Sequence, residues 1–160
     1  MDNPRIFERY YDLSLRFLSY RPRSEKEVLD YLKKKKIDEP SIILIINKLK
    51  SHNFLNDLDF SKFWIEKRLK IKPKAYRIIV LELKQKGISQ EIIEKASELF
   101  DSKNEMDIKS AIELIERRAR IYQNLPKDKA KEKLMNYLAR RGFSYDTIKK
   151  AMRDIDEKTV

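Results

Sequence analysis

The feature that most constrains the fold is an apolar pattern that occurs three times, in residues 28–42, 79–93 and 134–148. When the copies are aligned on a central leucine, apolar residues coincide at four further positions, and the offsets between copies are 51 and 55 residues. Such a repeat is typical of tandem units that each bury an apolar face against a neighbour. Unrelated amphipathic hairpins that resemble one another are the alternative. The coinciding positions are Val28/Ile79/Leu134, Leu29/Val80/Met135, Leu32/Leu83/Leu138, Ile37/Ile88/Phe143 and Ile42/Ile93/Ile148.

Apolar spacing is helical along nearly the whole chain, and no segment alternates as a strand does. Helix start and stop residues predict nine helices, with a long helix followed by a shorter pair in each copy. We therefore expect three repeats at residues 1–55, 56–104 and 105–160, with the polar stretch 101–105 as the clearest linker. Each short pair has the topology of a helix-turn-helix hairpin, which in many proteins enters a nucleic-acid groove but in many others binds nothing of the kind.

The expected helix ends depend on a few capping residues. Ser24, Asp38 and Asn56 or Asp57 are predicted N-caps, because their side-chain oxygens accept hydrogen bonds from free backbone N–H groups. Gly87 and Gly142 are predicted to end the middle helices of the second and third copies in the left-handed conformation. The first copy has Lys36 at this position, at a cost of about 1 kcal/mol.

Composition excludes several classes of site. The chain has no cysteine, one histidine and two glycines, which leaves no disulfide, no His/Cys metal cluster and no glycine-rich phosphate loop. No nucleophile lies in a recognisable dyad, and we expect His52 to be a surface or capping residue. Asp57 and Asp59 are interpreted as capping residues rather than as a metal or acid/base pair. We therefore expect a non-enzymatic chain without metal or cofactor. Because neither a membrane span nor a signal peptide is recognisable, we also expect the chain to be cytoplasmic.

The formal net charge of +11 is distributed over all three copies and is densest between Lys67 and Lys86. A folded basic stripe is the electrostatic footprint of a phosphate backbone, and a solvated helix face is the alternative. Most aromatic residues have core spacing. The tyrosines that we expect to be exposed, and so able to stack on an unpaired base, are Tyr10, Tyr11, Tyr20 and Tyr122.

Four segments, in this order, form a family pattern. They are Arg21-Pro22-Arg23-Ser24-Glu25-Lys26-Glu27, then Phe54-Leu55-Asn56-Asp57 with Phe60, Phe63-Trp64-Ile65 and Arg68, then Leu83-Lys84-Gln85-Lys86-Gly87-Ile88, and finally residues 138–146 around Arg140-Arg141-Gly142-Phe143. The pattern resembles the RecX family of bacterial recombination regulators and extends from about Tyr10 to Met152. Departures from it are Asn53 and Lys36, where glycine is usual, and the turn at Pro73, which lacks a glycine.

The resemblance implies an all-α protein of three tandem three-helix repeats that acts without catalysis. It implies binding to the RecA recombinase filament on single-stranded DNA, with inhibition or remodelling of strand exchange and ATP hydrolysis, and contact with double-stranded DNA as well. We expect an elongated, curved, monomeric array in which distributed cations contact phosphate or acidic side chains. A general DNA-binding protein and a protein-only adaptor are the alternatives. The expected contact residues are Arg21, Arg23, Arg68, Lys70, Lys72, Lys74, Arg77, Lys84, Lys86, Arg117, Arg118, Arg140 and Arg141. For Arg21, Arg68 and Arg140, intramolecular caps or ion pairs are an equal alternative.

Overall fold

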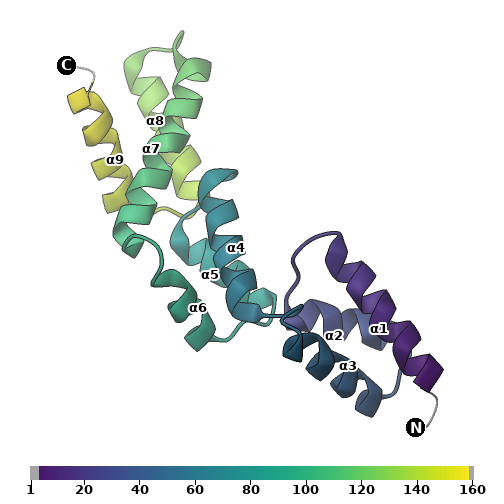
Figure 1. Cartoon of the computed structure of the whole chain (residues 1–160). Coiled ribbons are helices and arrows are strands. Elements are labelled where there is room, and N and C mark those ends of the chain that lie inside the picture. Colours follow the sequence, from purple (N-terminus) through teal and green to yellow (C-terminus); the bar gives the residue numbers. More distant parts are fainter. Residues whose placement is uncertain (1–3, 159–160) are drawn as a thin grey trace. The chain divides into compact units, whose positions relative to one another are not determined.

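The computed structural model describes residues 4–158, and this part of the chain forms nine helices and no strand (Figure 1). A long helix followed by a shorter pair occurs three times, as predicted. The outermost residues of the first and third predicted repeats, 1–3 and 159–160, lie outside the described residues. The helices are α1 (Pro4–Ser19), α2 (Glu25–Lys34), α3 (Glu39–Ser51), α4 (Asp57–Lys70), α5 (Tyr76–Gln85), α6 (Gln90–Ser97), α7 (Lys103–Tyr122), α8 (Lys127–Arg140) and α9 (Tyr145–Lys158).

The predicted N-caps of α2, α3 and α4 are confirmed. Ser24 and Glu27 form a reciprocal capping box at α2, in which each side chain accepts from the other residue's backbone N–H. Asp38 accepts from the N–H of Ser41 at α3, and Asn56 Oδ1 accepts from two backbone N–H groups of α4, at 3.0 and 3.1 Å. His52 is the C-cap of α3, where its Nδ1 lies 2.9 Å from the carbonyl oxygen of Lys48.

The predicted linker at residues 101–105 is largely wrong. Ser102 is the N-cap of α7 and forms a capping box with Glu105, so the helix already begins at Lys103. The polar composition of this stretch is that of a helix start, in which Ser and Glu three residues apart satisfy two backbone N–H groups. The third copy is the longest, and its extra residues lie in its first two helices. α7 has 20 residues, and α8 begins about one turn farther ahead of Leu138 than α2 begins ahead of Leu32 or α5 ahead of Leu83.

The helices form two compact units. The first comprises the described residues through Phe63 together with Leu83–Ala96, and the second comprises Trp64–Glu82 together with the described residues from Ser97 onward. In the second unit α7 lies along α8 and α9 (Figure 1). The core of the first unit includes Tyr11, Val28, Leu32, Ile42, Ile45, Ile46, Leu49 and Leu55. The core of the second unit includes Ala75, Ala111, Leu114, Ile115, Leu134, Leu138, Phe143, Ile148 and Ala151.

The repeated apolar skeleton accounts for much of both cores. Leu32, Leu83 and Leu138 are fully buried, and the residues four before and ten after each of them are buried in all three copies. The residue three positions before the leucine is half-buried in every copy. The position five after the leucine differs, because Ile88 and Phe143 are buried whereas Ile37 is half-buried. Four of the five repeat positions therefore have the same degree of burial in every copy, which supports the triplication.

A junction joins α2 to later parts of the chain within the first unit. Asp57, at the start of α4, accepts a hydrogen bond from the backbone N–H of Glu25 at 2.8 Å and so adds a second cap to α2. Ser24 Oγ donates to the carbonyl oxygen of Lys86 at 2.7 Å, and the Lys86 ammonium pairs with Glu27 at 3.2 Å. We call this set, with Gly87 packed against Lys26, the first junction.

The second unit contains an equivalent arrangement at α5. Asp107 of α7 accepts from the N–H of Tyr76 at 2.6 Å, and the carbonyl oxygens of Arg141 and Gly142 accept from the Ala75 N–H at 3.3 Å and from Arg77 Nε at 2.6 Å. We call this set, with Gly142 packed against Ile78, the second junction. The sequence predicted Asp57 to be a capping residue. It caps α2, which is distant in sequence, while Asn56 caps α4.

The two glycines are required by their surroundings as well as by their backbone conformation. A Cβ on Gly87 would lie 2.7 Å from Lys26 Cβ, and one on Gly142 would lie 2.5 Å from Ile78 Cγ1. Lys36 adopts the same left-handed conformation, with φ 57°, yet it is exposed and tolerates a side chain. Lysine in place of glycine at this position therefore marks a turn that is not part of a junction.

Candidate partner-binding surfaces

The two arginines of the α1–α2 loop are held by neighbouring groups. Arg21 pairs with Glu27 at 2.7 Å and also donates to the carbonyl oxygen of Pro22 at 3.0 Å. Arg23 Nε donates to the carbonyl oxygen of Phe17 at 2.9 Å, and its guanidinium lies 3.5 Å from the centroid of the Phe17 ring. Burial is the main cause that lowers the pKa of Arg23. Both arginines orient the loop, and Arg21 remains partly exposed.

The Glu82 carboxylate accepts hydrogen bonds from two cations of the predicted basic stripe and from Trp64. Arg68 Nε, Lys74 Nζ and Trp64 Nε1 donate to its carboxylate at 2.7, 2.5 and 3.0 Å. Burial alone would raise the pKa of Glu82, but these hydrogen bonds outweigh it and lower the pKa. Arg68 also stacks on the Trp64 ring at 4.7 Å. Arg68 and Lys74 are therefore committed to an internal cluster.

Other predicted contact residues support the junctions or the packing of α7. Arg77 and Lys86 belong to the second and first junctions. Arg117 donates to the carbonyl oxygens of Ile71 and Lys70, at 3.1 and 3.2 Å, and pairs with Glu113. Lys86 thus stabilises the first unit, and Arg77 and Arg117 stabilise the second.

Tyr137 lies between two further predicted cations. The guanidinium of Arg118 is 4.4 Å from the ring centroid, and that of Arg141 is 5.1 Å from it. A hydrogen bond with Tyr137 is the main cause that raises the pKa of Arg118. Both arginines keep their charge at the surface while their position is set by the ring.

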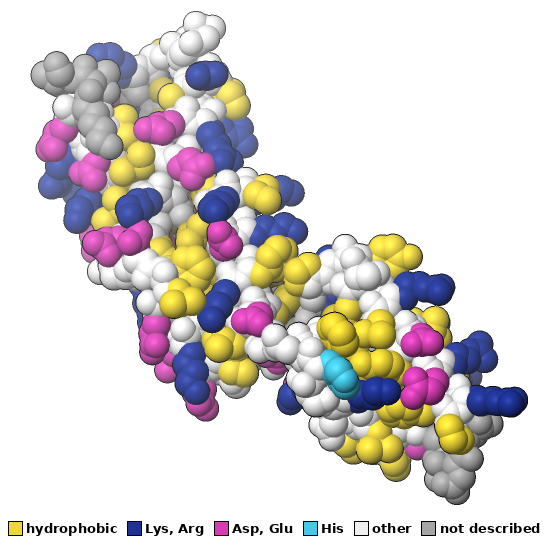
Figure 2. All heavy atoms as spheres, in the orientation of Figure 1, with side chains coloured by type: hydrophobic (Ala, Val, Ile, Leu, Met, Phe, Trp, Pro, Cys, Tyr) yellow, Lys and Arg dark blue, Asp and Glu magenta, His cyan; other side chains and the backbone are white. Residues whose placement is uncertain are grey.

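Four of the thirteen predicted cations stay largely available. Lys72, Lys84 and Arg140 are exposed and form no ion pair with another described residue. Lys70 pairs with Glu66 one turn earlier at 2.6 Å, yet its side chain is 72% exposed. For Arg21 and Arg68 the alternative of internal pairing is confirmed, whereas Arg140 has no such pair. In Figure 2 the basic side chains are scattered over the visible surface among acidic ones and do not form one patch.

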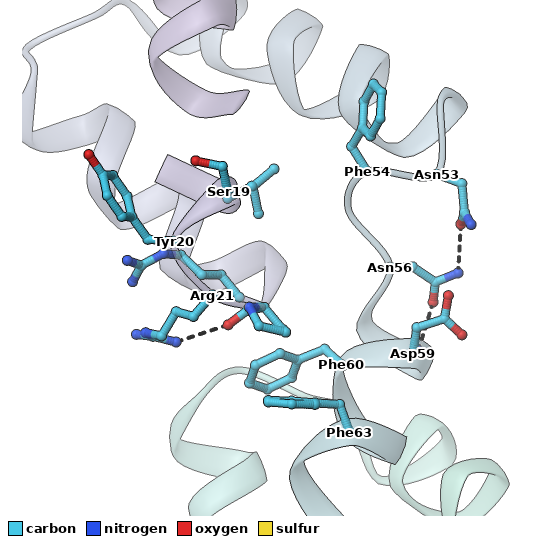
Figure 3. A pocket seen from close by; sticks show the side chains of 12 residues that line it. Ser19, Tyr20, Arg21, Asn53, Phe54, Asn56, Asp59, Phe60 and Phe63 are labelled. Atoms are coloured by element: carbon cyan, nitrogen blue, oxygen red, sulfur yellow. Dashed lines mark hydrogen bonds between the residues drawn. The ribbon is translucent and has the colours of Figure 1, made fainter. Parts of the chain in front are cut away.

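A pocket of about 460 Å³ lies in the first unit between the α1–α2 loop and the start of α4 (Figure 3). Phe60 and Phe63 line it beside the Arg21 loop, and Phe54 and Tyr20 stand at its ends. Tyr20 is 76% exposed, as expected for a possible base contact. The expectation of exposure is wrong for Tyr11, which is buried in the core because it faces α3 across the first unit. Tyr10 and Tyr122 are half-buried.

A hollow of similar volume, between α8 and α9 of the second unit, was not found by sequence reasoning. Its lining combines apolar and basic side chains: Lys131, Met135, Tyr145, Lys149, Met152, Arg153 and Asp156. The signal was present in α9, where the five lining residues from Tyr145 to Asp156 recur at helical spacing on one face, but the repeat pattern includes only Ile148 of this helix.

The described residues offer no group of three His, Cys, Asp or Glu side chains that could hold a metal ion. Residues 4–158 also contain no helix with the length and apolarity that a bilayer crossing requires. The described surface therefore presents cations among acidic side chains, exposed aromatic and aliphatic residues, and hollows such as the pocket beside the α1–α2 loop and the one between α8 and α9.

Comparison with known proteins identifies each repeat. Three models match in chain order: the first three-helix domain of RecX over residues 11–49, the second over 56–96 and the third over 105–152. These ranges support three repeats, while the boundaries at 55/56 and 104/105 stay a prediction.

Whole-chain relatives agree. The regulatory protein RecX of Finegoldia magna is 34% identical over 145 residues, which are 89% of this chain and 70% of that protein. The regulatory protein RecX of Bacillus subtilis is 33% identical over 146 residues, covering 91% of this chain and 54% of that protein. The chain spans about half the length of several curated relatives that it matches. The crystal structure of RecX from Lactobacillus salivarius superposes with a TM-score of 0.78 at 30% identity, over 94% of this chain and 96% of that one.

The fold thus defines an all-α protein built from three tandem three-helix domains, with a basic and non-uniform surface. The chain belongs to the RecX family of regulatory proteins.

Proposed function

We propose that this chain regulates the RecA recombinase by binding the filament that RecA forms on single-stranded DNA, and that binding lowers ATP hydrolysis and strand exchange. The observation that carries the proposal is the ordered match of all three RecX domains across residues 11–152. In this proposal the chain acts in the cytoplasm, as a monomer, and by binding rather than by catalysis.

The charges support a partner that presents phosphate groups. The net charge is +11, and Lys72, Lys84 and Arg140 form no ion pair with another described residue. Cations that are unpaired in the isolated chain lose no internal partner when they bind phosphate, so their binding energy is not offset by a broken ion pair. We therefore assign direct filament contacts to Lys72, Lys84 and Arg140. We add Lys70, which pairs with Glu66 but whose side chain is 72% exposed. Arg21, Arg23, Arg68, Lys74, Arg77, Lys86, Arg117, Arg118 and Arg141 chiefly shape the surface that carries them.

Charge reversal tests this assignment. The double variant Lys72→Glu/Arg140→Glu removes two exposed cations of the second unit, and we expect its affinity for RecA filaments on single-stranded DNA to fall about tenfold at moderate salt. Lys74 is left unchanged because a glutamate there would face Glu82 and destabilise the cluster.

The matched control is Lys127→Glu/Lys129→Glu, which changes the net charge equally at two exposed residues of the first turn of α8. It should bind nearly as the wild type does. Equal weakening by both double variants would mean that only net charge matters. No weakening by either variant, even at low salt, would contradict the filament contacts.

General DNA binding without recombinase is the second candidate function, and the scattered cations of Figure 2 favour it. It predicts affinity for bare DNA that falls steeply with salt and does not improve when RecA is present. The filament proposal predicts tighter binding in the presence of RecA.

A further inference from the structure

The hollow between α8 and α9 has an apolar floor. Met135 of α8 and Met152 of α9 are half-buried and pack against the core of the second unit, and Tyr145 forms an exposed wall. Methionine side chains are flexible and polarizable, and surfaces rich in them accommodate varied aliphatic and aromatic side chains. The floor can therefore accept an apolar side chain of a partner.

The rim of the hollow is basic. Lys131 lies on one side, Lys149 and Arg153 lie on the other, and Asp156 is the single acidic residue in the lining. The three cations are exposed and form no ion pair with another described residue, although Lys149 lies 5.3 Å from the Tyr145 ring centroid. Their charge is not neutralised within the described chain, so the rim favours an acidic partner.

The size of the hollow limits what can occupy it. Its α9 face runs from Tyr145 to Asp156, which at the rise of an α-helix is about 16 Å or three turns. This length matches a short amphipathic segment whose apolar side chains occupy the floor and whose carboxylates reach the rim. A nucleic-acid strand fits less well, because bases stack on flat aromatic faces and the lining offers only one aromatic ring.

We propose that the hollow between α8 and α9, which we call the groove, binds an acidic amphipathic peptide segment of a protein partner. The apolar side chains of the segment contact Met135 and Met152, and its carboxylates pair with Lys131, Lys149 and Arg153. This contact is separate from the cations assigned to the filament. It holds or fails independently of the proposed function, because its test contains neither recombinase nor DNA.

The test uses the full chain and a fluorescein-labelled peptide of about twelve residues with Leu on one helical face and Glu on the other. Fluorescence anisotropy at moderate salt should show saturable binding. Lys149→Glu/Arg153→Glu should weaken that binding at least about tenfold. Lys127→Glu/Lys129→Glu carries the same charge change outside the groove and should leave it nearly unchanged.

Two further measurements separate the groove from general electrostatic attraction. Met152→Ala, with its fold checked by circular dichroism, should weaken peptide binding without a change in charge. A peptide of the same composition in scrambled order should bind more weakly than the amphipathic one. Equal binding of both peptides, equal effects of the two double variants, or binding of a twelve-nucleotide oligo(dT) in place of the peptide would each overturn the proposal.

Discussion

In the first junction ion pairs around Glu27 join the turn at Gly87 to α2, whereas in the second junction the packing of Ile78 and one hydrogen bond from Arg77 join the turn at Gly142 to α5. Glu27 forms ion pairs with Arg21 and Lys86 in the first junction, and Ile78 packs against Gly142 in the second. Both junctions nevertheless use a half-buried aspartate from the following repeat, Asp57 or Asp107, to cap the N-terminus of the middle helix.

The comparison separates what the backbone requires from what side chains can exchange. A carboxylate on the free N–H and a glycine at the turn recur, because the helix end needs an acceptor and the close approach leaves no room for a Cβ. The side-chain contacts around them differ, with ion pairs in the first junction and mainly apolar packing in the second. We expect the stability of the second junction to depend more on side-chain shape, and the stability of the first junction to depend more on pH.

The largest effect is expected for Gly142→Ala. The new Cβ would meet Ile78 at 2.5 Å, in a backbone conformation with φ +93°. Overpacking together with left-handed strain should lower the free energy of unfolding by about 3 kcal/mol, measured by urea denaturation. Gly87→Ala should cost somewhat less, because its new Cβ would lie farther from its nearest neighbour, Lys26 Cβ at 2.7 Å, and because Lys26 Cγ and Cδ can rotate away. Equal costs would contradict the difference between the two junctions.

Glu27→Gln should cost about 2 kcal/mol at neutral pH, because it removes the carboxylate that Arg21 and Lys86 share. Burial opposes ionisation, but hydrogen bonds from Arg21 and the Ser24 backbone, with Lys86 nearby, lower the pKa of Glu27 to about 2. A lowered pKa stabilises the fold above the ordinary value of 4.5, and this stabilisation is lost as the pH falls toward 2. The difference between wild type and variant should therefore shrink over that interval. A constant difference from pH 6 to pH 2.5 would contradict it.

Asp107→Ala should cost about 1 kcal/mol through the lost helix cap. Burial is the main cause that raises the pKa of Asp107, so the folded state holds its proton more tightly than the unfolded state does. The stabilising contribution of Asp107 should then grow as the pH falls through its raised pKa, in the direction opposite to that of Glu27. Urea denaturation at pH 7 and pH 4 measures this, and a cost that decreases at pH 4 would contradict it.

The smallest effect, and the only stabilising one, is expected for Lys36→Gly. The residue is exposed with φ 57°, so glycine should relieve strain of up to about 1 kcal/mol. Thermal unfolding should shift upward by a few degrees at most. A clear loss of stability would mean that the lysine side chain makes a contribution that its exposure does not indicate.

Local features of the fold could be predicted from the sequence. Ser24, Asp38, Asn56 and the two glycines act within a few residues of their own position, and the repeated apolar residues identify the core faces. The junction carboxylates could not be assigned in the same way. Asp57 and Asp107 cap helices about thirty residues earlier in the chain, and the residues next to them in the sequence do not indicate which helix each one caps.

The candidate surface was predicted less well, for a similar reason. The sequence shows where a cation is but not whether an acidic group or carbonyl oxygen from elsewhere already holds it. Arg117 donates to carbonyl oxygens 46 and 47 residues away, and Lys74 meets Glu82 only because a turn brings them together. The groove between α8 and α9 required the packing of two helices before Met135 and Met152 could be placed in one lining.

The most direct test of the central claim is RecA ATP hydrolysis on single-stranded DNA, with this protein titrated at fixed moderate salt and its binding to the bare DNA followed in parallel. We predict that hydrolysis falls at protein concentrations well below those that coat the DNA. Hydrolysis that stays unchanged, or that falls only once the DNA is saturated, would contradict regulation at the filament and leave a general DNA-binding protein.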